Sequence, residues 1–228
     1  MRPLITNLLD NNSWLLSLPE EARSELLSVA SFRRVGAGHV LFRQGDSCAD
    51  LYGLLSGRIK IGAITYSGNE LVINTKLPGD WFGEIAILDG KERTHGAEAV
   101  ELSELVIIPK AAITQLNTKN RAIHDALIAL ICRHCRQAFS AIDDFLILTP
   151  EQRLASRLVN LNLIENKAQP IKLKLNQHEL SCLIGVSRQS ISKILKKWEQ
   201  NKFISRGYNS IEVLSIDKIQ ALIDQVGE

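Results

Sequence analysis

The stretch from Trp81 to Ala97, WFGEIAILDGKERTHGA, has a glycine, a glutamate and an arginine in an order that suits binding of an anion. Gly83 precedes a short apolar run, and we predict a single helical turn entered through this glycine. Such a turn exposes backbone N–H groups and the positive end of a helix dipole, which favour a phosphate. Arg93, nine residues after Glu84, can bind a phosphate through two parallel hydrogen bonds. Glu84 can accept hydrogen bonds from a sugar hydroxyl.

A second interpretation of the same residues needs no ligand. Glu84 and Arg93 have opposite charges, and an ion pair between them would brace the loop that joins them. The sequence leaves both interpretations open.

A second stretch whose residue spacing indicates a function runs from Ser187 to Trp198, SRQSISKILKKW. At a helical period its apolar residues fall on one stripe, which predicts packing onto a small core. The opposite face is basic and polar and has no acidic residue. Ser187 is a favoured N-cap, so Arg188 lies in the first turn, where a cation opposes the helix dipole. Local stability therefore does not explain Arg188.

The residues before this helix predict a helix-turn-helix. Asn176 and Glu179 have the spacing of a capping box, and Gly185 provides the turn between two short helices. A basic and polar second helix is typical of the element that enters the major groove of DNA. The candidate DNA-binding residues are Ser187, Arg188, Gln189, Ser192 and Lys193. The alternative is a surface αα-hairpin whose lysines only keep it soluble.

The elements that position these two stretches differ in pattern. Residues 4–30 have helical spacing, whereas residues 32–109 consist of short apolar runs separated by turns such as Gly36-Ala37-Gly38 and Pro78-Gly79-Asp80. Runs of this kind at even spacing predict an antiparallel barrel or roll. We expect strands at 40–42, 51–55, 59–65, 71–77 and 102–108.

A long helix is predicted over residues 119–148, which contain neither glycine nor proline. Apolar residues recur along it every three or four positions, so one face can pack on the roll and another on a partner helix. We favour a homodimer through this helix, because a helix-turn-helix protein usually reads paired half-sites about 34–36 Å apart. A purely intramolecular helix is the alternative.

Thr149-Pro150-Glu151-Gln152 ends the long helix and begins the next, with Thr149 as N-cap and Pro150 at the first helical position. Beyond it we expect a helix over 150–165, a strand over 171–175, the helix-turn-helix, a hairpin around 207–209 and a helix over 216–226. The expected fold is α+β, with an effector-binding antiparallel β-roll at 1–118, a dimerisation helix at 119–148 and a winged helix-turn-helix domain at 149–228.

Charge and composition agree with two kinds of domain. The net charge is +2, yet residues 150–228 contain twelve Lys or Arg and eight Asp or Glu, against fifteen and seventeen in residues 1–149. The basic excess accompanies the predicted DNA-binding helix. No apolar run approaches about 20 residues, so we expect no membrane span and a cytoplasmic protein with reduced cysteines.

Together the two stretches carry a family resemblance. FGEIAILDGKERT resembles the phosphate-binding cassette of cyclic-nucleotide-binding domains, and with VSRQSISKILKKWE behind it the chain resembles the CRP/FNR family of bacterial transcription regulators. The resemblance implies a regulator of double-stranded DNA controlled by a cyclic nucleotide such as cAMP, with RNA polymerase as a partner if it activates. It implies base-reading roles for Arg188, Gln189 and Lys193. It assigns ligand contacts to Gly83, Glu84, Ile85, Ala86, Arg93 and Thr94, with Ile73 as a further pocket residue.

Arg188 suits guanine and Gln189 suits adenine in such a helix. Recognition of a base in the ligand is left open, because Ala138 and Phe139 stand where cAMP-responsive members have small hydroxyl residues. His95 follows the cassette where the family often has a small residue, and we expect it to pack at the edge of the roll.

Other constellations do not favour catalysis or a metal site. Cys132 and Cys135 share a helix face, yet two thiols and one histidine do not complete a zinc or iron–sulfur site, so we interpret them as buried thiols in a helix interface. We expect no enzyme. Two alternatives stay open, a regulator of the same fold that needs no ligand or takes an unknown one, and a redox or metal sensor.

Overall fold

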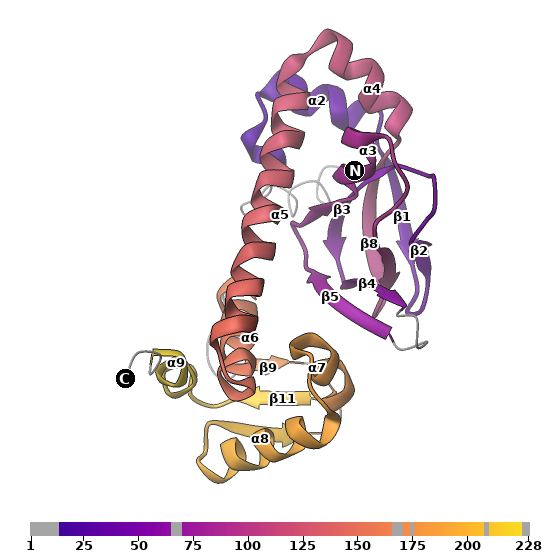
Figure 1. The fold of residues 1–228 in the computed structure, drawn as a ribbon. Coiled ribbons are helices and arrows are strands. Elements are labelled where there is room, and N and C mark those ends of the chain that lie inside the picture. Colours follow the sequence, from indigo (N-terminus) through magenta and orange to yellow (C-terminus); the bar gives the residue numbers. More distant parts are fainter. Residues whose placement is uncertain (1–13, 65–69, 166–170, 174–175, 208–209, 225–228) are drawn as a thin grey trace. The chain divides into compact units, whose positions relative to one another are not determined.

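The computed structural model describes residues 14–64, 70–165, 171–173, 176–207 and 210–224. The chain divides into two compact units, Met1–Arg136 and Gln137–Glu228. Figure 1 shows the elements of each unit. The predicted three-part division at residues 118 and 148 stays a prediction.

The first unit contains two four-stranded antiparallel sheets, in the orders β1-β8-β3-β6 and β2-β7-β4-β5 (Figure 1). This confirms the predicted β-roll. The strands are β1 (Ser31–Val35), β2 (Val40–Phe42), β3 (Leu51–Ser56), β4 (Ile59–Ile64), β5 (Glu70–Lys76), β6 (Trp81–Phe82), β7 (Gly96–Ala99) and β8 (Ser103–Ile108).

Strand β3 explains how the roll is held together, because both of its faces are buried. Tyr52 and Leu54 lie in the core between the two sheets. Leu51 and Leu55 face a second core, formed with the helices of the unit. A strand buried on both faces has a continuous apolar sequence instead of an alternating one, as Leu51 to Leu55 does.

Four helical elements that lie before or after the strands pack on this second core: η1 (Trp14–Ser17), α2 (Glu20–Ser28), α4 (Lys110–Lys119) and the start of α5 (Arg121–Ile147). The helical character expected over 4–30 is confirmed in its described part by η1 and α2, and Pro19 is the N-cap of α2. Helix α4 was not predicted. The long helix begins at Arg121 and not at 119, because Asn120 is extended, with φ −136° and ψ 100°.

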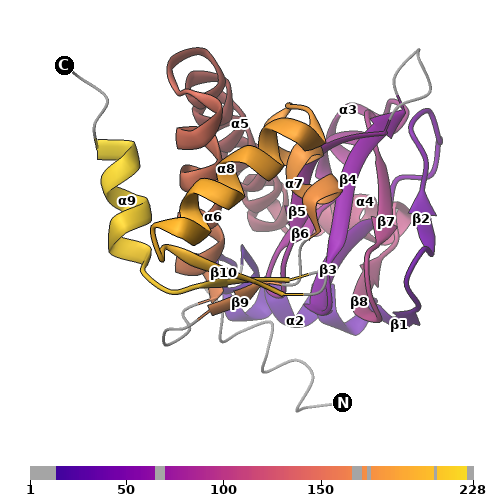
Figure 2. The same cartoon turned by 90° about the horizontal axis from the view of Figure 1, so that it is seen from below.

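The second unit contains the end of α5, α6 (Pro150–Glu165), α7 (Gln177–Ile184), α8 (Arg188–Gln200) and α9 (Ile216–Asp224). A three-stranded antiparallel sheet joins β9 (Ile171–Leu173), β11 (Ser210–Val213) and β10 (Ile204–Gly207). Helices α7 and α8 pack on one another, and β10 packs on α8 (Figure 2). This order confirms a winged helix-turn-helix; residues 174–175, 208–209 and 225–226 of the predicted elements lie outside the described ranges.

Local signals in the sequence form as predicted in this unit. Thr149 and Gln152 make a reciprocal capping box at the start of α6, with N···O distances of 3.0 and 3.4 Å. Asn176 and Glu179 make another at the start of α7, at 2.7 and 2.9 Å. Each box satisfies backbone N–H groups that the first helical turn leaves without partners. In the described part of the chain, no helix is long and apolar enough to span a membrane.

Candidate functional site

Gly83 is the N-cap of α3 (Glu84–Asp89) and has a φ of +99°, in the left-handed region. A Cβ at this position would lie 2.6 Å from the Asp50 carbonyl oxygen and 2.8 Å from Arg93 Nη1. Glycine is therefore required both by the backbone conformation and by the close approach of Arg93. This confirms the helical turn entered through a glycine.

Arg93 lies against Gly83 and is 4% exposed. Its Nη1 donates to the Gly83 carbonyl at 2.9 Å and its Nη2 to the Asp50 carbonyl at 2.7 Å. The guanidinium carbon is 4.0 Å from the ring centroid of Phe42, a cation–π contact. Its Nε is buried and has no hydrogen-bond partner. The charge is thus held by neutral groups, and no carboxylate of the described residues pairs with it within 4.0 Å.

Glu84 contacts a different side chain from the one the sequence suggested. Its carboxylate is buried, and its Oε1 lies 2.8 Å from Nδ1 of His134 on α5. The Nε2 of His134 lies 3.2 Å from the Lys76 ammonium on β5. An ionised carboxylate only accepts and an ammonium only donates, so a neutral His134 with its proton on Nδ1 satisfies both. The Glu84–Arg93 ion pair offered as an alternative is wrong.

Burial affects the pKa values of Glu84 and Lys76, the two charged residues that His134 connects. Burial by itself would raise the pKa of Glu84, but the hydrogen bond from His134 and the positive charge of Lys76 outweigh it, so this pKa lies below its usual value. Burial lowers the pKa of Lys76, against the opposing charges of Asp80 and Glu84. His134 therefore links a buried carboxylate to a buried ammonium.

The other predicted ligand residues differ in location and in exposure. Ala86 is buried in α3, whereas Ile85 is 36% exposed and Ile73 on β5 is 40% exposed. Thr94 is exposed, and its hydroxyl lies 3.1 Å from His95 Nδ1. His95 is half-buried, and burial lowers its pKa. The ligand roles of all seven residues stay predictions.

A cavity of about 410 Å³ opens on the sheet formed by β2, β7 and β4. None of the predicted ligand residues lines it. Phe42 does, and its ring also lies under the Arg93 guanidinium. The wall of the cavity is formed by Val40, Phe42, Arg43, Gln44, Lys60, Gly62, Ala63, Ile64, Gly96, Ala97 and Glu98.

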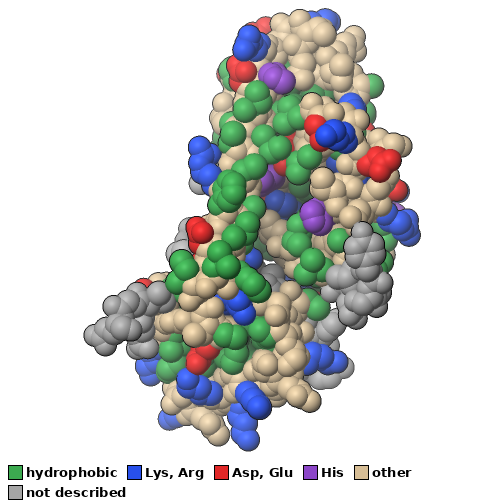
Figure 3. Space-filling model, viewed as in Figure 1, with side chains coloured by type: hydrophobic (Ala, Val, Ile, Leu, Met, Phe, Trp, Pro, Cys, Tyr) green, Lys and Arg blue, Asp and Glu red, His purple; other side chains and the backbone are tan. Residues whose placement is uncertain are grey.

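Helix α8 presents the predicted polar face of the helix-turn-helix. Gly185 turns the chain with a φ of +68°, and the Ser187 hydroxyl accepts from the Ser190 N–H at 3.2 Å. Ile191, Leu195 and Trp198 are buried, each stabilising the unit by about 1.5–3 kcal/mol. Arg188, Gln189 and Lys193 are exposed, whereas Ser192 is half-buried. Figure 3 shows Lys and Arg side chains over α8.

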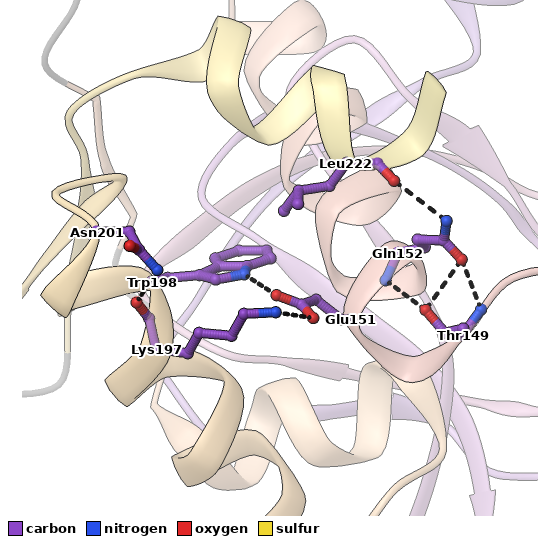
Figure 4. A network of polar contacts seen from close by, with 7 residues as sticks. All are labelled: Thr149, Glu151, Gln152, Lys197, Trp198, Asn201 and Leu222. Carbon is purple, nitrogen blue, oxygen red and sulfur yellow. Dashed lines mark hydrogen bonds and ion pairs between the residues drawn. The ribbon is translucent and has the colours of Figure 1, made fainter. Parts of the chain in front are cut away.

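Glu151 on α6 was missed by the sequence reasoning. Its two carboxylate oxygens accept from Trp198 Nε1 and Lys197 Nζ, both at 2.8 Å (Figure 4). His134 was missed as a partner of Glu84, although it continues the helical spacing of the buried Leu127 and Leu130. That spacing could have placed its imidazole on the face of α5 that packs on the roll.

A different face of α5 carries exposed apolar side chains, visible as a band along the helix in Figure 3. They recur at intervals of four and three residues, the spacing of a coiled-coil seam: Ile128, Cys132, Cys135, Phe139, Ile142 and Leu146. Cys132 and Cys135 are exposed in the single chain, so their burial in a helix interface stays a prediction that needs a partner helix. Among the described residues, no group of three or more His, Cys, Asp or Glu side chains could hold a metal ion.

Comparisons with known proteins agree with both halves of this description. A family model described as the cyclic nucleotide-binding domain matches residues 32–120, and one described as the Crp-like helix-turn-helix domain matches residues 152–222. The chain is 30% identical over 195 residues to the cyclic AMP receptor protein of Thermus thermophilus, covering 86% of this chain and 88% of that protein. It is 25% identical over 194 residues to the transcriptional activator protein anr of Pseudomonas aeruginosa, covering 83% of this chain and 79% of that protein.

Solved structures show the same fold at lower identity. A CRP/FNR family transcriptional regulator from Thermus thermophilus aligns with a TM-score of 0.74 at 23% identity, over 86% of this chain and all of that chain. The c-di-GMP responsive global regulator CLP of Xanthomonas campestris aligns with a TM-score of 0.74 at 20% identity, over the same shares. With the β-roll, the cassette and the winged helix-turn-helix in place, these matches show that the chain belongs to the CRP/FNR family of transcription regulators.

Proposed function

We propose that this transcription regulator binds double-stranded DNA as a homodimer and is controlled by a small anionic ligand, a cyclic nucleotide such as cAMP. The observation that carries the ligand proposal is the environment of Arg93. A buried guanidinium that has an orphan Nε and no carboxylate partner carries an uncompensated charge, which is costly in a protein interior. An anion beside it would compensate this charge.

The residues around Arg93 fit a cyclic nucleotide. The left-handed Gly83 brings the backbone close to the arginine. Glu84 has acceptor capacity for a sugar hydroxyl. The relatives point to more than one nucleotide, because one is named a cyclic AMP receptor protein and another is described as c-di-GMP responsive. We place cAMP first among the candidates because its relative matches at the higher identity.

The apolar band on α5 supports a dimer through this helix. Phe139 is 66% exposed, Ile142 52% and Leu146 75%. A second copy of the same helix would bury all three, as in a two-stranded coiled coil. The two α8 helices would then read paired half-sites, and a shift in the end of α5 on ligand binding would change their spacing. Such coupling is typically worth about 1–3 kcal/mol. RNA polymerase remains a partner predicted for an activator.

Calorimetric titration of the whole protein with cAMP and with cGMP tests the ligand proposal. We expect heat from at least one nucleotide, and its loss in Arg93→Met. Arg34→Met, which removes an exposed arginine from β1, is the matched control and should bind as the wild type does. Absence of heat with either nucleotide at millimolar concentration would refute the cyclic nucleotide and favour a regulator with another effector or none.

The unfolding midpoint of Arg93→Met distinguishes a ligand-binding role of Arg93 from a purely structural one. Methionine can keep the contact with Phe42, and it removes a buried charge that has only neutral partners. We expect the unfolding midpoint of the first unit to stay level or rise while ligand binding is lost. A lower midpoint with binding retained would identify Arg93 as a structural brace between Gly83 and Asp50.

A further inference from the structure

Glu151 joins the first turn of α6 to the last turns of α8 (Figure 4). Its Oε1 accepts from Trp198 Nε1 at 2.8 Å, and its Oε2 accepts from Lys197 Nζ at 2.8 Å. One carboxylate therefore binds two consecutive side chains of the helix that carries the predicted DNA-binding residues.

The two partners depend on Glu151 for different reasons. The Trp198 side chain is fully buried, and its indole N–H is a donor that needs an acceptor when removed from water. The Lys197 side chain is 58% exposed, and Glu151 neutralises its charge. Glu151 lies in the first turn of α6, where the helix dipole favours a negative charge.

The same turn of α6 is tied to the other helices of the second unit. Gln152 Nε2 donates to the Leu222 carbonyl on α9 at 3.1 Å (Figure 4). Arg153 Nη1 donates to the Phe145 carbonyl near the end of α5 at 3.0 Å. Residues 151–153 thus connect the end of the long helix to α8 and α9, and Glu151 makes the connection to α8.

We propose that Glu151 is a positioning residue for DNA recognition, with two effects on α8. Through the hydrogen bond to Trp198 it fixes the position of α8 relative to α6. Through Lys197 it withdraws one lysine from the set of cations that can contact DNA phosphates. The inference rests on the proposed DNA-binding function.

The second effect has a quantitative signature. Arg188, Lys193 and Lys196 are exposed on α8, and within the described ranges they form no ion pair at 4.0 Å or less. Lys197, beside them, is paired. Each lysine or arginine that neutralises a phosphate changes the slope of log K against log salt concentration by about −0.9. Freeing Lys197 should therefore steepen the slope.

The charge effect is tested with the full-length protein and a random-sequence duplex of about 40 base pairs, long enough for paired half-sites. Glu151→Gln keeps an acceptor for Trp198 and releases Lys197 in both protomers, so we expect a slope steeper by about 1.8, which is about 0.9 for each lysine. Lys197→Met should leave the slope unchanged, and the double variant should restore the wild-type slope. Glu212→Gln is the matched control, because it changes the net charge equally but lies on β11 without an ion pair in the described structure.

The positioning effect is tested by the ratio of specific to non-specific affinity, using a duplex that the wild type selects from a random library. Glu151→Ala should lower this ratio about tenfold, since it leaves the indole N–H unsatisfied, whereas Glu151→Gln should preserve it. Trp198→Phe should lower the ratio to the same extent, and the double variant no further, because both changes remove one hydrogen bond. Trp198→Phe also keeps the test decisive if Glu151→Ala does not fold.

Three outcomes would overturn the inference. They are an equal slope for Glu151→Gln and Glu212→Gln, a shallower slope for Lys197→Met alone, and an unchanged ratio for Glu151→Ala and Trp198→Phe. A wild-type protein that retains no duplex at low salt would instead refute the DNA-binding function itself. The two failures are therefore distinguishable.

Discussion

The Nδ1 of His134 lies 2.8 Å from the Glu84 carboxylate, so a side chain of the long helix contacts the predicted ligand-binding cassette directly. Lys76 contacts the other ring nitrogen at 3.2 Å. A ligand hydroxyl that binds Glu84 must share this carboxylate with His134. A ligand that binds Glu84 would therefore change a contact made by α5 itself.

The His134–Glu84 contact predicts an acid-dependent stability of the first unit. The pKa of Glu84 is below its usual value, so the ionised form stabilises the fold above the unfolded-state pKa of about 4.3 and loses this effect as the pH falls through the lower folded-state pKa. His134→Ala should cost about 1–3 kcal/mol near neutral pH. The difference from the wild type should shrink in acid, as both proteins protonate Glu84.

Thermal unfolding measured across this pH range checks the prediction. In a Glu84→Gln background, His134→Ala should have a smaller effect that does not vary with pH. A difference between His134→Ala and the wild type that is constant with pH would contradict the electrostatic account.

Replacing glycines at the two ends of α3 should separate backbone strain from steric contact. Gly83 and Gly90 both have left-handed φ values, +99° and +71°. A Cβ at Gly90 would meet nothing closer than Lys110 Nζ at 3.9 Å. Gly90→Ala should cost about 1–2 kcal/mol, measured by urea denaturation. Gly83→Ala should lower the free energy of unfolding by more than this and should also abolish nucleotide binding, because its methyl group displaces Arg93. An equal loss of stability in the two variants would show that the residues around Gly83 move aside without cost.

Phe139 offers a test of the dimer, because its side chain is exposed on α5 in the single chain. Phe139→Asp should weaken self-association by at least about 2 kcal/mol, roughly 30-fold, in sedimentation equilibrium. Its effect on the stability of the unit should stay within about 0.5 kcal/mol. Gln137→Asp, which adds the same charge at an exposed position on another face of α5, is the control. Equal association in both variants would place the interface elsewhere.

Arg188 and Lys196 should contribute to DNA binding in different ways. Arg188→Ala should cost about 1–3 kcal/mol on the selected duplex and relax its sequence preference, because arginine can read a guanine edge. Lys196→Ala should weaken binding to all duplexes similarly and lower the salt slope by about 2 for the dimer, about 1 for each lysine. Binding measured on selected and random duplexes distinguishes the two. Unchanged affinity and preference in Arg188→Ala would mean that another element reads the DNA.

The sequence by itself determined the order and type of most elements, because their signals are local. The capping pairs Thr149–Gln152 and Asn176–Glu179, the Ser187 cap and the left-handed Gly83 and Gly185 involve residues at most three or four apart. The apolar stripe of α8 likewise follows from helical periodicity. The family resemblance rests on the same local motifs. The break at Asn120 had no glycine or proline to mark it, so the start of α5 was misplaced, and α4 was missed although Pro109 directly precedes it.

Only the tertiary structure decided which partners the charged residues have. Glu84 and His134 are 50 residues apart, Arg93 and Asp50 are 43 apart, and Glu151 and Trp198 are 47 apart. Opposite charge made Arg93 the plausible partner of Glu84, yet the packing of α5 on the roll brought His134 to the carboxylate and left Arg93 over Phe42. Charge sets which pairs are favourable, whereas the packing of distant apolar faces sets which groups meet.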